Sequence, residues 1–411
     1  MSPSQLFRPH EGWWRSARFK AGIIAFLAGW SLGVVLQYFE IFTRYDQTDL
    51  DHYVQNTPKD ERLSDRITVV AITDDDYEEV FNATSPLDSS KVLDVVKTLQ
   101  GYHPPPRVIA VDLLTQEWKQ PLDAADLQGS PFVVWAQVGE QEKAKPGQSA
   151  IRLNLGGVAG HPRPPGYVCA APPFLPEDSD GRIRRYYTSV EANDRGGALV
   201  PTMPWLLASV YPDLPLDCAK APKAEAKLIE FAGQGHNIPI LPVSAVMRDE
   251  ERALAPRISN RIVLLGATYG AARDSYKTSS ENRSGVEVLA HTVETELGIS
   301  RRLLTPAEGA LLALVSGLVF FALAFVLKPP YDLVLSALAP VLFAFVGGWI
   351  VYQHFGFFIG IASTMLGVPI GVAVEHYVEL LALETKLSEM QKRPAAATDG
   401  SDPAASDRGG L

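Results

Sequence analysis

The sequence predicts an α/β domain with a largely parallel sheet, carried by four transmembrane helices. Two observations support this fold class. Short, continuous runs of Val, Ile and Leu alternate with helical patterns in the central part of the chain, and four long apolar stretches flank that part. Continuous apolar runs are typical of strands that are covered on both faces, and strand–helix–strand alternation is typical of a parallel sheet.

Each of the four apolar stretches is long enough to cross a membrane. A helix needs about 20 apolar residues to span roughly 30 Å of hydrocarbon. We expect transmembrane helices at residues 21–39, 309–327, 333–351 and 355–374. A cleaved signal peptide is the alternative for the first stretch. Its apolar core is long, however, and no cleavage-site pattern follows it, which favours an uncleaved anchor.

The distribution of basic residues predicts the orientation. Residues 1–20 contain several basic residues directly before the first apolar stretch, so this segment is expected in the cytoplasm. Residues 40–305 are then periplasmic or extracellular, and the C-terminus is again cytoplasmic. Arg301 and Arg302 oppose this assignment, but a large folded domain is translocated regardless of such charges. We therefore expect a multi-pass protein of the inner or plasma membrane, with membrane lipid as one partner.

Within residues 40–305, short apolar runs predict strands and two amphipathic segments predict helices. The strands are expected at residues 66–72, 107–113, 131–136, 226–231 and 261–266. The helices are expected at residues 88–99 and 286–297, where apolar residues recur on one face. Residues 139–176 are rich in Pro and Gly, which predicts extended surface loops, with a hairpin among them as a further option.

Composition and motifs exclude several functions. The net charge is -10 and no basic run with interleaved aromatic residues occurs, which argues against nucleic-acid binding. The sequence contains no CxxC, HExxH or G-x-S-x-G motif, so we expect no metal site, no cofactor and no enzymatic activity. Cys169 and Cys218 lie in the part expected outside the cytoplasm. They either form a disulfide there or are two unrelated buried thiols.

Polar residues follow several of the expected strands. The carboxyl ends of parallel strands lie at one edge of a sheet, which is where α/β proteins bind ligands. The residues expected at this edge are Asp74, Asp75, Asp76, Asp112, Thr268 and Asp274. Such clustered carboxylates would suit a cation or an amine-bearing small molecule. The alternative is that these residues cap helices and add charge to solvated loops.

Two further patterns favour structural roles. The segment GATYGAAR lacks the Lys-Ser/Thr ending of a phosphate-binding loop, and a tight turn that needs small residues explains it better. His291 and Glu294 stand three residues apart on an expected helix, but no third ligand lies nearby in the sequence. We therefore expect a packed histidine at the helix surface rather than a metal ligand.

Residues 375–393 are expected to form a cytoplasmic amphipathic helix. Its apolar residues recur at alternating spacings of three and four, as in a short coiled-coil seam. The seam residues are Leu380, Leu383, Leu387 and Met390. This seam would dimerise the chain or dock a partner protein; the alternative is a helix that rests on the membrane surface. Residues 394–411 have the composition of a disordered tail.

The order of motifs along the chain resembles a known family. The segment VVAITDDDY is followed by VIAVDLL, DGRIRRYY, GATYGAARD and GVEVLAHTVETEL, and then by three close-set apolar stretches. This order is similar to the second CHASE family of sensor domains, where CHASE stands for cyclase/histidine-kinase-associated sensory extracellular. The resemblance covers about residues 15–375. It implies an extracytoplasmic sensor with one span before it and three after it.

The resemblance also bears on the output of the signal. Members of this family usually carry a kinase or a nucleotide cyclase after the last span, but only residues 375–411 follow it here, and no catalytic domain fits in that length. We therefore expect a receptor-like sensor that relays its signal to a separate effector protein. The alternative is a structural or assembly component of an envelope complex, with the outer domain as a docking surface. A homodimer is compatible with both.

Overall fold

The computed structural model of the chain describes most of residues 43–303, residues 346–358 and isolated positions elsewhere. The gaps lie at residues 57–63, 114–117, 119–126, 128–130, 138–139, 142–151, 155–167, 193–195, 212–217, 219, 232–236, 249–250 and 299–300. The chain divides into two compact units. One comprises Gln47–Leu304 and Trp349–Ile359 and is called the α/β unit below. The other comprises Met1–Asp46, Thr305–Gly348 and Gly360–Leu411.

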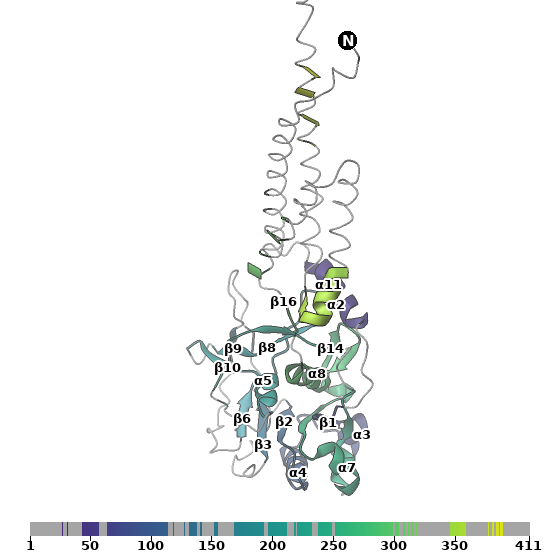
Figure 1. Cartoon of the computed structure of the whole chain (residues 1–411). Coiled ribbons are helices and arrows are strands. Elements are labelled where there is room, and N and C mark those ends of the chain that lie inside the picture. The colour runs from purple at the N-terminus through teal and green to yellow at the C-terminus, as the bar shows by residue number, and fades with distance from the viewer. Residues whose placement is uncertain are drawn as a thin grey trace, which may run out of the picture. The chain divides into compact units, whose positions relative to one another are not determined.

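A six-stranded, entirely parallel sheet forms the centre of the α/β unit (Figure 1). In spatial order its strands are β12 (Ile240–Pro242), β1 (Ile67–Ile72), β13 (Ile262–Ala267), β2 (Val108–Asp112), β3 (Phe132–Ala136) and β6 (Val168–Ala171). The predicted α/β class with a largely parallel sheet is thereby confirmed. Strand β13 comes late in the sequence but is inserted between β1 and β2, so the two most central strands are distant in sequence.

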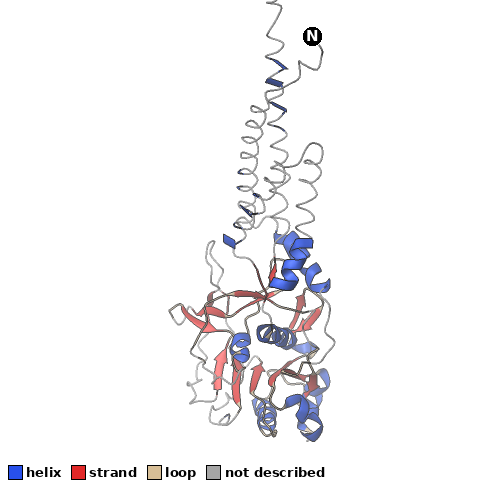
Figure 2. Ribbon diagram, in the orientation of Figure 1, coloured by secondary structure: helices blue, strands red, loops and turns tan. Residues whose placement is uncertain are grey.

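Helices cover both faces of this sheet (Figure 2). One face carries α4 (Ser89–Gln100), α6 (Val243–Met247) and α7 (Glu251–Ile258), and the other carries α5 (Met203–Ala208) and α8 (Gly285–Leu297). Successive residues of a strand point to opposite faces. Val70 therefore joins the core beneath α4, whereas Val69 joins the core beneath α8. This double coverage explains the uninterrupted apolar runs in the sequence.

Three smaller sheets are built from the remaining strands. The first has the spatial order β10 (Ala198–Pro201), β9 (Ser189–Ala192), β5 (Arg152–Asn154) and β4 (Glu140–Gln141). The second has the order β17 (Phe357–Phe358), β16 (Arg301–Leu303), β11 (Ala226–Leu228) and β8 (Arg185–Tyr187). The third has the order β15 (Asn282–Ser284), β14 (Ser275–Thr278) and β7 (Arg182–Ile183). The run expected as a strand at residues 226–231 forms β11, which pairs antiparallel with β8 and β16 outside the parallel sheet. Residues 139–176 contain the antiparallel pair of β4 and β5, which agrees with the hairpin option, and β6, which the loop-like composition does not predict.

Side-chain caps define where the two predicted helices begin. Asp88 precedes α4 and accepts a hydrogen bond from the Ser90 backbone N–H at 2.9 Å. Ser284 precedes α8, and Glu287 Oε2 accepts from the Ser284 backbone N–H at 2.9 Å and from its hydroxyl at 2.7 Å. This reciprocal arrangement is a capping box, which satisfies N–H groups that the first turn leaves without partners.

Most residues of the four expected spans lie outside the described part of the chain, as do residues 1–20 and 394–411. Among the residues that the structure describes, no helix is both long and apolar enough to cross a membrane. Near the join between the expected third and fourth spans, Gly348–Phe355 form helix α11 and Phe357–Phe358 form strand β17.

Gly266 provides a test of the packing between α8 and the sheet. A Cβ atom at this position would lie 2.6 Å from the Cβ of Val286 on α8. We expect Gly266→Ala to lower the free energy of unfolding by about 1–3 kcal/mol, because β13 and α8 must move apart. Gly101→Ala is the control, since its Cβ would meet the Thr98 carbonyl at 3.3 Å. Both variants are unfolded in denaturant, and equal stability of the two would contradict this packing.

Candidate functional site

Asp76 is a structural carboxylate that ties two helices together. It lies in α3 (Asp74–Glu79) and is 1% exposed. Its carboxylate accepts hydrogen bonds from the Thr73 backbone N–H (3.1 Å) and hydroxyl (2.9 Å), and from the backbone N–H groups of Val243 (3.0 Å) and Ser244 (2.9 Å) at the start of α6. Burial alone would raise its pKa, but these hydrogen bonds outweigh burial and lower the pKa. Groups of the domain itself therefore donate to both oxygens of the Asp76 carboxylate.

Three other residues of the predicted acidic edge also have local roles or face solvent. Asp74 Oδ1 accepts from the Gly270 backbone N–H at 2.9 Å, which holds the turn after β13. Thr268 donates its backbone N–H (3.0 Å) and its hydroxyl (3.2 Å) to the Ile72 carbonyl. Asp75 is exposed. The contacts of Asp74 and Thr268 are local loop contacts of the kind given above as the alternative, and ligand binding by these residues stays a prediction.

Asp112 and Asp274 lie together at the carboxyl end of the central strands. Asp112 ends β2 and stands beside Gly266 of β13. Gly266 packs against α8, whose first residue, Gly285, donates its backbone N–H to the Asp274 carbonyl at 3.0 Å. A Cβ at Gly285 would overlap the Asp274 carboxylate, so that carboxylate rests directly on the N-terminus of α8. The charge of Asp274 contributes to the raised pKa of Asp112.

Both of these carboxyl groups hold protons more tightly than usual. Burial raises the pKa of Asp112 to about 7, and the neighbouring charge of Asp274 adds to the rise. Burial also raises the pKa of Asp274, against hydrogen bonds from the Tyr276 hydroxyl and the Gly285 backbone. Tyr276 is not among the site residues expected from the sequence. Its place two residues after Asp274 in an extended segment, where both side chains lie on one side of the strand, is the signal that would have found it.

A second group of charges surrounds Arg184, whose side chain is 3% exposed. Its guanidinium holds Asp51 in a bidentate pair, with both nitrogen–oxygen distances 2.7 Å. It also contacts Asp178 at 3.1 Å and Asp180 at 2.7 Å. The hydrogen bonds from Arg184 lower the pKa of Asp180 to about 2. Asp51 lies on α2 (Thr43–Asn56), so a buried arginine fastens α2 to the segment DGRIRRYY.

Comparison with known families assigns this fold. The CHASE2 domain family matches residues 23–326, which is most of the chain. The chain belongs to the CHASE2 family. CHASE2 domains are extracellular sensory domains, as the ordered motifs of the sequence indicate. Comparisons with curated proteins and with solved structures give no significant match.

Three segments of the α/β unit that are close in sequence to expected spans pack together. We call residues 47–56, 301–303 and 349–358 the junction. The Tyr53 ring of α2 lies 5.7 Å from Tyr352 and 5.8 Å from Phe358, measured between ring centroids. The Arg301 guanidinium lies 4.3 Å from the centroid of the Tyr352 ring. Strand β16 also pairs in parallel with β17. Figure 1 shows α2 and α11 side by side.

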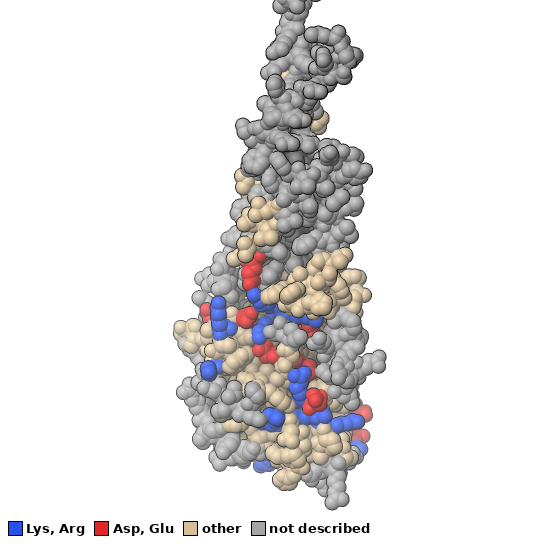
Figure 3. Space-filling view, in the orientation of Figure 1, with Lys and Arg blue, Asp and Glu red and all other residues tan. Residues whose placement is uncertain are grey.

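The junction is also linked to the body of the CHASE2 domain by buried charge. Arg301 lies 2.6 Å from Glu230, and both side chains are less than a tenth exposed. The Glu230 backbone N–H in turn donates to the Thr295 hydroxyl of α8 at 3.0 Å. On the molecular face drawn in Figure 3, acidic and basic side chains are interspersed rather than separated into large patches of one sign.

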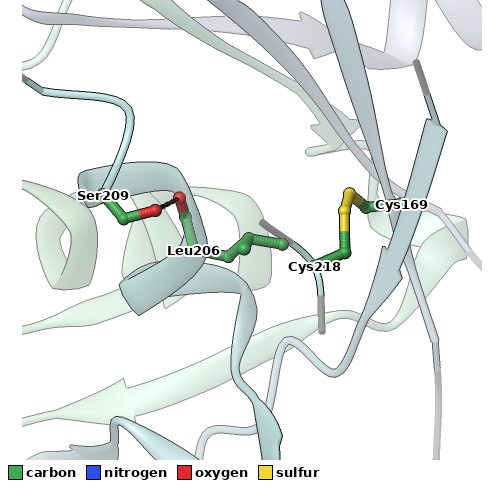
Figure 4. Close-up of a disulfide and its surroundings, with 4 residues drawn as sticks. All are labelled: Cys169, Leu206, Ser209 and Cys218. Atoms are coloured by element: carbon green, nitrogen blue, oxygen red, sulfur yellow. Dashed lines mark hydrogen bonds between the residues drawn. A yellow bond between two sulfur atoms is a disulfide. The ribbon is translucent and has the colours of Figure 1, made fainter. Parts of the chain in front are cut away.

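The structure joins Cys169 and Cys218 in a disulfide, with their Cα atoms 6.0 Å apart. Figure 4 shows this bond beside α5, near Leu206 and Ser209. Cys169 lies on β6, the last strand of the parallel sheet, so the bond attaches Cys218 to the edge strand of that sheet.

His291 has a structural setting. Its side chain is 6% exposed and lies edge-on to Phe231, with ring centroids 5.8 Å apart. Burial, together with the charge of Arg283, lowers its pKa to about 3, so the ring is neutral at physiological pH. Glu294 accepts from Ser64 at 3.0 Å and from Arg66 at 2.9 Å. The described residues contain no group of three or more acidic, histidine or cysteine side chains placed to hold a metal ion.

The C-terminal seam is described only in part. Leu380 and Leu387 are helical, with exposed fractions of 61% and 55%, whereas Leu383 and Met390 lie outside the described residues. A partner for this helix therefore stays a prediction.

Asp76 provides a test of the structural role. We expect Asp76→Ala to lower the free energy of unfolding by about 2–4 kcal/mol, because it leaves buried N–H groups of α6 without acceptors. Since the pKa of Asp76 is lowered in the folded state, this loss should be complete above about pH 4 and shrink as the pH falls further. Asp75→Ala, at the exposed neighbouring position, is the control. Equal unfolding midpoints for the two variants would contradict the capping role.

Arg184 provides a test of the attachment of α2. Arg184→Met removes the buried cation that three carboxylates share. Arg182 still contacts Asp51 at 3.0 Å and Arg185 still contacts Asp178, so we expect a loss of about 2–4 kcal/mol in unfolding free energy, less than for fully unpaired buried charges. Arg248→Met is the matched control, because Arg248 is exposed and its distance to Glu79 is 4.0 Å. The control should cost less than about 1 kcal/mol. Proteolysis after α2 should also become faster in Arg184→Met alone; unchanged cleavage would show that Arg184 does not hold this helix.

Proposed function

We propose that this chain is a membrane receptor-like sensor, whose CHASE2 domain detects a stimulus outside the cytoplasm and relays it through the membrane to a separate effector protein. The proposed arrangement places residues 40–305 outside, one span before them and three after, with both termini in the cytoplasm. The domain acts by changing shape rather than by catalysing a reaction. Membrane lipid and the effector are the proposed partners.

The junction is the observation that carries this proposal. Its segments come from three parts of the chain that are close to expected spans, and they pack as one cluster around Tyr53 and Tyr352. A sensor must convert a change in one domain into a movement of several membrane helices together. Segments that share ring contacts, a buried guanidinium and a strand pairing are suited to move as one body.

Two further observations support the outside location. A disulfide between Cys169 and Cys218 suits an oxidising compartment, since cytosolic thiols are normally kept reduced. In addition, residues 349–359 belong to the same compact unit as the domain. In the proposed topology, the connection between the expected spans 333–351 and 355–374 lies on the same side of the membrane as the domain. Its place in the same compact unit as the domain supports this topology.

The proposal is tested by identifying what binds the C-terminal helix. The intact chain is purified gently from native membranes and compared with a chain truncated after Val374, which lacks residues 375–411. Truncation after Arg393 is the matched control, because it keeps residues 375–393 and removes only the tail. We expect a cytoplasmic kinase, cyclase or other effector to co-purify with the intact chain and with the control, and to be lost after truncation at Val374.

Another result would favour the alternative of an envelope scaffold. If only envelope proteins co-purify, in constant ratio and equally with all three chains, the signalling proposal fails. The outer domain would then be a docking surface.

A further inference from the structure

The disulfide joins an exposed cysteine to a buried one. Cys218 is exposed, whereas Cys169 on the edge strand β6 is only 5% exposed. A thiol-bearing molecule can therefore approach this bond from the Cys218 side. The sequence contains two cysteines, and both are in this bond, so reduction would not be followed by exchange with another thiol of the same chain.

Cys218 lies on the connection between two elements that both contact α8. Before it comes α5, whose Leu206 shares a buried core with Leu289 of α8. After it comes β11, whose Lys227 holds Glu296 in the last turn of α8 at 2.8 Å. A change in this connection therefore acts on α8 from two sides.

The disulfide fixes this connection to the edge of the parallel sheet. Met203, the first residue of α5, donates its backbone N–H to the carbonyl of Pro172, directly after β6, at 2.9 Å. The disulfide is a second link to β6, formed by a residue that follows α5 in the chain, and it lies beside Leu206 and Ser209 of this helical segment (Figure 4). Breaking the disulfide removes the covalent one of these two links.

The segment that begins at Cys218 leads to the junction. It continues into β11, which pairs antiparallel with β16. Just after β11, Glu230 lies 2.6 Å from Arg301 of β16, and its backbone N–H donates to the Thr295 hydroxyl of α8 at 3.0 Å. The contacts of α8 and β11 therefore connect the disulfide to the part of the domain that is close in sequence to the expected spans.

We propose that the disulfide between Cys169 and Cys218 is a redox switch of this domain, which an external dithiol opens by attack at Cys218. This inference names a stimulus for the sensor proposed above and rests on that function for its biological meaning. Reduction frees the connection between α5 and β11, so these two elements hold α8 less firmly, and β16 loses part of its support.

Reduction consumes one dithiol and produces its cyclic disulfide. A thiolate of the reductant bonds to the Cys218 Sγ, the bond between the two cysteine sulfurs breaks, and Cys169 leaves and takes up a proton. The second thiolate of the reductant then displaces Cys218 from the mixed disulfide, and Cys218 is also protonated. Two electrons thereby pass to the protein, and the two protons of the dithiol end on the two cysteines.

The switch is tested on the full chain in lipid nanodiscs, at constant pH and without denaturant. Mixtures of reduced and oxidised dithiothreitol are applied, free thiols are alkylated, and the peptides are weighed. We expect Cys169 and Cys218 to be reduced together and to reoxidise when the oxidised reagent is in excess. The monothiol glutathione should be trapped as a mixed disulfide on Cys218 rather than on Cys169.

The structural response is measured by hydrogen exchange of the oxidised and reduced chains. Amides of α8 and β16 should exchange at least about tenfold faster after reduction, whereas those of α4, on the opposite face of the sheet, should not change. The double variant Cys169→Ser/Cys218→Ser should show the fast exchange without any dithiol. Ser209→Ala, which lies beside the disulfide and keeps it, is the matched control and should respond as the parent chain does.

The outcomes separate this inference from the proposed function. A disulfide that resists the dithiol until the chain unfolds overturns the switch. Unchanged exchange in α8 and β16 after reduction also overturns it, as does an equal increase in α4, because the bond would then only stabilise the domain as a whole. The parent chain alone gives these results, so they do not depend on the folding of a variant. Each of them leaves an effector found by co-purification unaffected.

Discussion

The close packing of α8 on the central strands is the interaction on which the rest of the domain depends. Gly266 lets α8 approach β13, since any larger residue would overlap Val286. This approach brings the N-terminus of the helix to the carboxyl end of the sheet, where Asp274 meets Asp112. It also directs the other end of the helix towards β11 and Glu230, and through them towards the junction. One helix therefore contacts Asp274 at its N-terminus and, near its C-terminus, residues that lead to the junction.

The domain treats its buried charges in two different ways. Asp76 and Arg184 are surrounded by donors or by opposite charges, and each fastens a helix: α6 in one case and α2 in the other. Removing one partner of such a group is costly because the other remains buried and charged. Burial instead raises the pKa of Asp112 to about 7, and it also raises the pKa of Asp274 against hydrogen bonds from the Tyr276 hydroxyl and the Gly285 backbone. Uncompensated titratable groups are candidates for function, whereas fully compensated ones stabilise the fold.

Strand ends alone could place the predicted acidic residues at one edge of a sheet, but could not distinguish their roles. Asp74, Asp75 and Asp76 are adjacent in sequence and have three different environments: a turn, solvent and a buried double cap. The difference depends on which backbone N–H groups the tertiary fold brings near each carboxylate. Arg184 lies in the segment DGRIRRYY, but its partner Asp51 is 133 residues away. No local sequence pattern could therefore reveal this pair.

The sequence by itself determined the α/β class, the central strands, the two long helices and the CHASE2 family, because these depend on local periodicity, capping residues and motif order. It also determined that Asp112 and Asp274 would lie at the same edge of the sheet. Tertiary structure alone decided the place of β13 between β1 and β2, the separate sheet of β11, and the convergence of three distant segments at the junction. These features rest on contacts between residues far apart in the chain, whose free energy depends on burial and partners rather than on neighbouring residues.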